Sequence, residues 1–136
     1  MSVPVPLERL REAVEERGSS AYLLTVKDDG SPQAVHAPLR WDDAALVADV
    51  GKRSGGNAAV RPAVSLLFPA RKTGDYSLIV DGTAVVTTDE SGAHVLITPT
   101  WAVLHRPGPA PQPGSTCSDD CVPVFSDPTT PRSGRR

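Results

Sequence analysis

The first part of the chain has the residue spacing of an amphipathic helix. Leu7, Leu10 and Val14 recur at intervals of three and four residues, and charged residues fill most positions between them. This spacing places the three apolar side chains on one face of a helix. Pro6 suits the first helical position, and Gly18 is typical of a helix C-terminus. The pattern predicts a short helix that covers an apolar surface elsewhere in the fold.

After Gly18 the pattern changes to runs of apolar and β-branched residues that are separated by turn signals. Clusters such as Asp28-Asp29-Gly30 are typical of tight turns between strands. The six predicted strands are Ala21 to Val26, Pro32 to Trp41, Ala45 to Val50, Ala63 to Phe68, Tyr76 to Thr88, and Ala93 to His105. Regular strand spacing with short connections indicates a mainly β barrel or sandwich.

The second strand alternates, and a period of two puts its side chains on opposite faces of a sheet. One face carries Val35, Ala37, Leu39 and Trp41, and the other carries Ala34, His36, Pro38 and Arg40. Proline cannot donate to a ladder, so Pro38 predicts an edge or a bulge. Asp81-Gly82 within the fifth strand predicts a sharp bend such as a barrel corner needs, and Pro99 predicts a kink in the sixth.

The segment from Gly51 to Pro62 is basic and rich in glycine. We expect it to begin as a loop and to form one helical turn over Asn57 to Val60, which Pro62 ends. Lys52 and Arg53 supply positive charge, and the arginine fork matches phosphate geometry. Glycines let backbone N–H groups approach an anion closely. These residues fit a phosphate site, and they equally fit a flexible basic surface loop.

Composition narrows the function classes. The formal net charge is -2 and aromatic residues make up 4%, which argues against a nucleic-acid binder because such proteins need basic and stacking surfaces. No apolar run reaches the roughly 18 residues of a membrane span. The N-terminus lacks the apolar core of a signal peptide, so we expect a cytoplasmic protein.

Beyond Arg106 the chain becomes rich in proline, glycine and serine. Such composition buries too little apolar surface to offset the entropy of ordering. We therefore divide the chain into a domain over residues 1–106 and a disordered tail over residues 107–136. Cys117 and Cys121 supply at most two zinc ligands, so we expect free thiols or a tail disulfide and no metal site.

The order of elements, with the motif Gly51-Lys52-Arg53-Ser54, then Asn57 and Arg61-Pro62, resembles the flavin-binding split barrels of the pyridoxamine 5'-phosphate oxidase family. That family includes deazaflavin-dependent reductases. The resemblance covers Leu7 to Arg106. It implies a six-stranded antiparallel split β-barrel, a homodimer, and an oxidoreductase with FMN, or alternatively the deazaflavin F420, at the dimer interface.

The resemblance also implies a cofactor site. The implied site residues are Gly51, Lys52, Arg53, Ser54 and Asn57 for the phosphate, with Asp49, Val50, His36, Ala37 and Pro38 for the ring. Ser54 stands where the family often has a lysine. The C-terminal substrate-binding region of true pyridoxamine phosphate oxidases is absent, which argues against that particular reaction. His36 contacts the ring or substrate, or is a solvent-facing strand histidine. Trp101 closes the pocket from the second subunit, or packs in the core or dimer.

No residue is an evident acid or base, since the carboxylates fall mostly in turns where solvent surrounds them. These are Asp28, Asp29, Asp42, Asp43, Asp89 and Glu90. Chemistry would then belong to the cofactor, with the protein binding and orienting it. A second hypothesis is a non-catalytic flavin- or haem-binding module on the same barrel, with His36 as a candidate haem ligand. A third, ranked last, is an unrelated barrel that binds nucleic acid or peptide. The small-molecule substrate is not identified by the sequence.

Overall fold

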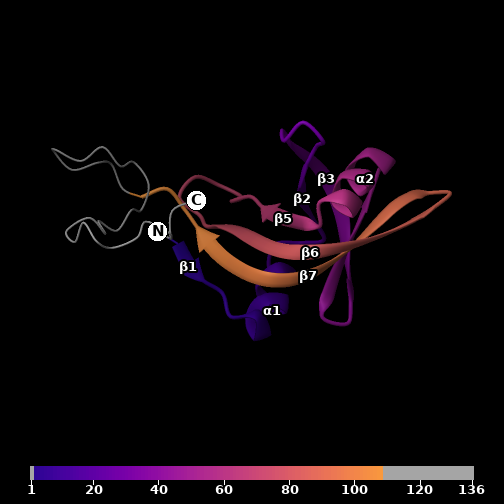
Figure 1. The fold of residues 1–136 in the computed structure, drawn as a ribbon. Helices are drawn as coiled ribbons and strands as arrows, with labels where there is room; N and C mark the ends of the chain where they lie inside the picture. Colours follow the sequence, from indigo (N-terminus) through magenta and orange to yellow (C-terminus); the bar gives the residue numbers. More distant parts are fainter. Residues whose placement is uncertain (1, 109–136) are drawn as a thin grey trace, which may run out of the picture.

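The strands form one antiparallel sheet that closes on itself. The computed structural model describes residues 2–108. Sheet order is β1-β7-β4-β3-β2-β5-β6, and a further pairing of β6 with β7 closes the barrel (Figure 1). The strands are β1 (Ser2–Pro4), β2 (Ser20–Val26), β3 (Pro32–Asp42), β4 (Ala45–Val50), β5 (Ala63–Phe68), β6 (Ser77–Asp89) and β7 (Gly92–His105).

The predicted fold class is confirmed: β2 to β7 make a closed six-stranded antiparallel barrel, and every predicted strand lies within one residue of its observed bounds. The three-residue strand β1 was not predicted, because it is too short to show a periodic pattern. It pairs with the end of β7, where Ser2 lies opposite His105 and Pro4 lies opposite Val103.

The alternation predicted for β3 is confirmed. Ala37 is fully buried, and Val35, Leu39 and Trp41 pack against the same core. The intervening side chains are exposed. The barrel interior is filled by large apolar side chains that are almost fully inaccessible, Leu23, Leu46, Leu66, Phe68, Leu78, Val80, Val95 and Ile97. Burial of each such side chain contributes about 1.5–3 kcal/mol, so this interior is the main source of stability.

Two of the predicted breaks, at Pro38 and at Asp81-Gly82, have a counterpart in the strand pairing. Pro38 lies in the part of β3 that pairs only with β2, since pairing with β4 begins at Leu39. The register of β6 against β7 shifts between Asp81 and Gly82. A Cβ on Gly82 would lie 2.6 Å from Ile97 Cγ2, so only glycine lets the backbones approach this closely.

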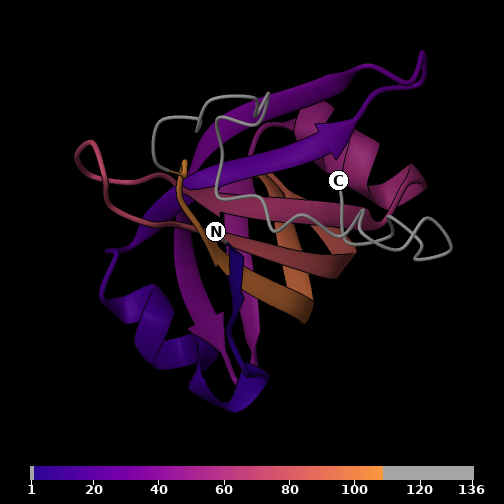
Figure 2. The same cartoon turned by 90° about the vertical axis from the view of Figure 1, so that its left-hand side faces the viewer.

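Two short helical segments cover the barrel. The predicted N-terminal helix begins as a 3-10 turn, η1 (Leu7–Arg9), and continues as α1 (Leu10–Glu15), which buries Leu10 and Val14. The second helix, α2 (Lys52–Val60), packs against β6, β7 and β2. Figures 1 and 2 place α1 and α2 at opposite ends of the barrel. Over residues 2–108, no helix has the length and apolar character to cross a membrane.

The predicted tail lies almost entirely outside the described residues, as do Cys117 and Cys121. The division at residue 106 therefore stays a prediction.

Candidate functional site

The N-terminus of α2 presents two cations beside unbonded backbone donors. Gly51 is the N-cap residue, and Lys52 and Arg53 are the first two helical residues, both exposed. The helix has no side-chain cap and no acidic residue in its first turn. The first N–H groups of a helix have no partner within it, and its dipole disfavours cations at this end. A bound anion would satisfy these donors and neutralise the two side chains.

The helix begins five residues earlier than predicted, so the expectation of a basic loop followed by one turn over Asn57 to Val60 was wrong. Gly55 and Gly56 lower helix propensity, which favoured the loop. In the structure, however, a Cβ on Gly55 would lie 2.3 Å from the Cβ of Ala93 and 3.5 Å from Val86 Cγ1. Packing of α2 against β6 and β7 overrides local propensity, and Gly55 serves that contact rather than exposing its N–H to an anion.

Ser54 and Asn57 face the barrel. Ser54 is only 3% exposed, so its hydroxyl is not presented to solvent as the predicted phosphate role requires. The Asn57 amide nitrogen donates to Thr25 Oγ1 at 3.1 Å and to Gln33 Oε1 at 2.9 Å. The Asn57 side chain therefore anchors α2 to β2 and β3, whereas Lys52 and Arg53 are exposed cations in the first turn of the helix.

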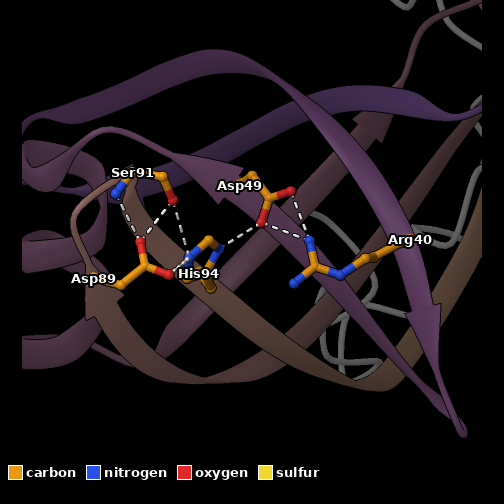
Figure 3. A network of polar contacts seen from close by, with 5 residues as sticks. All are labelled: Arg40, Asp49, Asp89, Ser91 and His94. Carbon is orange, nitrogen blue, oxygen red and sulfur yellow. Dashed lines mark hydrogen bonds and ion pairs between the residues drawn. The ribbon is translucent and has the colours of Figure 1, made fainter.

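Asp49 lies at the centre of a chain of charged contacts on the outer face of the barrel (Figure 3). Arg40 Nη1 donates to both carboxylate oxygens of Asp49, at 2.7 and 2.6 Å. His94 Nδ1 lies 2.7 Å from Asp49 Oδ1, and its Nε2 lies 2.8 Å from Asp89 Oδ2. Ser91 donates to Asp89 through both its N–H, at 2.8 Å, and its hydroxyl, at 2.6 Å. These contacts join β3, β4, the end of β6, the β6–β7 turn and β7.

This arrangement stabilises the charged form of each group. Hydrogen bonds from Ser91 and then His94 lower the pKa of Asp89 to about 2. Hydrogen bonds from His94 and Arg40 lower the pKa of Asp49. The same contacts, with Asp49 first and Asp89 second, raise the pKa of His94. Because both ring nitrogens face a carboxylate, the imidazolium is the form that donates two hydrogen bonds.

Asp89 is exposed, as predicted, but sequence reasoning missed its contacts with Ser91 and His94. It also missed Arg40 and His94 as partners of Asp49. The alternation of β3 did place Arg40 on the outer face. The pairing of Asp49 with His94 depends on the register of β4 against β7, where they lie directly opposite each other. These strands are far apart in the sequence, so no local pattern reveals the contact.

The predicted ring-binding residues of β3 divide between two faces. His36 and Pro38 are exposed on the outer face, as is Arg40. Ala37 points into the core and is fully buried, so only its backbone is open to a ligand. The ring of His36 lies against that of Tyr22, with centroids 5.1 Å apart.

The structure brings some of the predicted residues together. The Arg40–Asp49 ion pair joins the outer faces of β3 and β4, and Asp49, half-buried Val50 and Gly51 lead directly into Lys52. No hydrogen bond or ion pair between described residues connects His36 with Lys52 or Arg53. Within residues 2–108, no cluster of histidine, cysteine and carboxylate side chains has the arrangement of a metal site.

Comparison with curated proteins reveals a family relationship. The chain is 37% identical over 140 residues to an uncharacterized protein of Mycobacterium bovis, with 91% of this chain and 96% of the relative covered. An uncharacterized protein of Mycobacterium tuberculosis matches equally well. No family model matches the chain.

Solved structures with the same fold are more distant in sequence. A putative pyridoxamine 5'-phosphate oxidase from Listeria innocua superimposes with a TM-score of 0.59 at 20% identity, covering 73% of this chain and 98% of that one. An F420 reductase superimposes with a TM-score of 0.56 at 20% identity, covering 67% of this chain and 94% of the reductase. The haem storage protein HutZ of Vibrio cholerae gives 0.55 at 16% identity, with coverages of 73% and 94%. The chain therefore belongs to one family with the uncharacterized mycobacterial proteins, and its fold is that of the pyridoxamine 5'-phosphate oxidase-like split barrels.

Proposed function

We propose that this protein is an oxidoreductase that binds a phosphorylated flavin-type cofactor, FMN or alternatively F420, at the interface of a homodimer. The observation that carries the proposal is the N-terminus of α2, where Lys52 and Arg53 flank unpartnered backbone donors and no acidic side chain lies in the first turn. This donor set fits a phosphate group. When bound, the cofactor would supply hydride or two-electron transfer.

The ring would lie along the outer face of β3 and β4, next to the phosphate position. Pro38 is exposed there, and the Arg40–Asp49 pair borders the same surface. Val50 and Gly51 would provide backbone at the ring edge. The fold is shared with a FAD-binding protein of Mesorhizobium loti and with an F420 reductase, and this likeness supports a flavin-type ligand.

The homodimer is supported by apolar side chains on the outer wall. Val85 is 61% exposed and Trp101 is 46% exposed. Val85 lies directly opposite half-buried Leu96 in the β6–β7 ladder. A second copy that covered these side chains would remove their apolar surface from water. We expect sedimentation equilibrium to give a dimer, and Val85→Asp to shift it toward monomer. A wild-type monomer would contradict this part of the proposal. A cytoplasmic location stays a prediction.

The phosphate site is tested by comparing FMN with riboflavin, which lacks the phosphate. Affinity is followed by quenching of Trp41 and Trp101 fluorescence. We expect wild-type protein to prefer FMN, and the Lys52→Ala/Arg53→Ala variant to lose this preference, with FMN affinity falling about tenfold or more. Arg9→Ala removes an exposed cation near α1 and serves as the control. Equal affinity for FMN and riboflavin in the wild type, or unchanged FMN affinity in the double variant, would reject the site.

A second candidate is a non-catalytic haem-binding module, which the fold shared with HutZ favours. Exposed His36 on β3 is its candidate axial ligand. We expect His36→Ala to alter the absorbance spectrum of haem-loaded protein if this function is the correct one. An unaltered spectrum would remove His36 as a ligand, and absorbance bands of any chromophore that co-purifies would separate the two candidates.

A further inference from the structure

Two surface hollows meet at Arg17 and Arg71. The larger, about 460 Å³, is lined by these two residues and by Arg106, Glu16, Asp75 and Tyr76. The smaller, about 260 Å³, is lined by the same two arginines with Tyr22, His36, Ser20 and Phe68. Arg17 follows the end of α1, and Arg71 lies in the loop between β5 and β6. In Figures 1 and 2 this loop lies away from α2.

The two shared guanidinium groups are held in place but are not neutralised. Arg17 Nη1 donates to the carbonyl of Tyr76 at 3.1 Å, and Arg71 Nη2 donates to the carbonyl of Glu16 at 3.1 Å. Each guanidinium has five N–H donors. Neither forms an ion pair with any carboxylate of residues 2–108. Most of their hydrogen-bonding capacity therefore remains available to a ligand.

Arg17 carries a further signal, because its Nε is buried and has no hydrogen-bond acceptor among the described residues. A buried donor without an acceptor is unfavourable, and such groups call for an explanation such as a bound molecule or ion. Because this Nε has almost no accessible surface, an oxyanion in the hollows would bind first through the Nη groups of Arg17. A small shift of the guanidinium would then bring the Nε–H to the same oxyanion.

The charge of the smaller hollow favours an anion. The described residues that line it include the guanidinium groups of Arg17 and Arg71 and no carboxylate. The two reciprocal backbone contacts of Arg17 and Arg71 tie the end of α1 to the β5–β6 loop, so the positive groups are preorganised.

We propose that these hollows form a binding site for a small molecule that carries a phosphate or carboxylate group. The oxyanion lies between Arg17 and Arg71, and the organic part contacts the Tyr22–His36 ring pair in the smaller hollow. Guanidinium groups suit both oxyanions because their donors form a planar fork. This site is separate from the phosphate position proposed at α2, and its existence does not depend on that function.

The proposal is tested by NMR of arginine Nε–H signals in the full chain. The probes are inorganic phosphate, acetate and phenyl phosphate. We expect saturable shifts of the Arg17 and Arg71 signals, with the tighter-binding probe showing which oxyanion is preferred. Equal shifts at Arg9, or no saturable shift at Arg17 with any probe, would overturn the site, since they indicate only general screening of charge.

Two substitutions separate ligand binding from folding. Arg71→Gln should weaken phosphate binding about tenfold or more, because a charge-assisted hydrogen bond is lost. Lys72→Gln, in the same loop but outside both hollows, is the matched control. Arg17→Lys keeps a positive charge but removes the Nε donor, so it should remain folded and still bind phosphate more weakly. Affinities equal to wild type in both variants would refute the proposal.

Two further variants show where the phosphate and the phenyl group bind. His36→Ala should remove the extra affinity of phenyl phosphate over inorganic phosphate, and an unchanged difference would refute the role of the smaller hollow. Lys52→Gln/Arg53→Gln should leave the shifts at Arg17 intact. Loss of those shifts would show that the phosphate binds at α2 instead and would overturn the second site.

Discussion

Two adjacent glycines of α2 should respond to alanine in opposite directions. A Cβ on Gly55 lies 2.3 Å from the Cβ of Ala93, whereas one on Gly56 meets nothing within 4 Å. The Cβ of Ala93 is fixed to the backbone of β7 and cannot rotate away. Interiors are too closely packed to absorb such an overlap locally, so Gly55→Ala must move α2 away from the sheet.

The magnitudes follow from these contacts. Alanine is more favourable than glycine in a helix interior by about 1 kcal/mol, so Gly56→Ala should raise the free energy of unfolding by about 0.5–1 kcal/mol. Gly55→Ala gains the same propensity but incurs an overpacking cost of about 1–3 kcal/mol or more. The short Cβ–Cβ distance places it at the upper end, and we expect a net loss of at least about 1 kcal/mol. Each kcal/mol corresponds to about 4–8 °C in Tm for a domain near this size.

Urea unfolding, followed by circular dichroism, measures both changes. The Gly55→Ala/Ala93→Gly variant removes the opposing methyl group and should be more stable than the sum of the two single changes indicates. Gly55→Ala should also weaken FMN binding, because α2 carries Lys52 and Arg53. If Gly55→Ala is as stable as Gly56→Ala, or if positions 55 and 93 show no coupling, the packing argument is refuted.

Three further predictions concern the polar contacts. The pKa of His94 is raised in the folded protein, so its contribution to stability is complete below about pH 6.5 and is lost as pH rises through the raised pKa. Urea unfolding from about pH 5 to about pH 9 should therefore show a fall in the free energy of unfolding that His94→Gln lacks. Parallel pH profiles for the two proteins would contradict this. In acid, Asp89 should lose its contribution to the free energy of unfolding as pH falls from its ordinary pKa of 3.8 toward its lowered pKa of about 2. Asn57→Ala removes a donor to Thr25 Oγ1, which is in a residue only 1% exposed, and should lower the free energy of unfolding by about 1–3 kcal/mol. Adding Thr25→Val should recover part of this loss, and no recovery would indicate another cause.

The barrel could be predicted because its signals are local. Alternation in β3 and the turn residues between strands each act over a few residues, and burial then selects one register. The interruptions in strand pairing at Pro38 and Gly82 were also predictable, because proline lacks a backbone donor and glycine lacks a side chain. The length of α2 was missed because the deciding contact, between Gly55 and Ala93, joins residues far apart in the chain.

The candidate site was predictable only in part. Lys52 and Arg53 were identified because charge and glycine spacing are visible in the sequence. The inward orientation of Ser54 depends on how α2 rests on the barrel, which no local pattern encodes. The pairing of Asp49 with His94, and the convergence of Arg17 with Arg71, arise from tertiary structure alone.

The central position of β7 has a consequence for biosynthesis. This strand, the last within residues 2–108, pairs with β6, β4 and β1, and its pairing with β6 closes the ring. While a ribosome is still adding residues before Gly92, β4 and β6 remain open edges able to pair with other nascent chains. Closure must therefore wait until nearly the whole barrel sequence has left the exit tunnel, and a premature stop before β7 would yield an aggregating fragment rather than a smaller barrel.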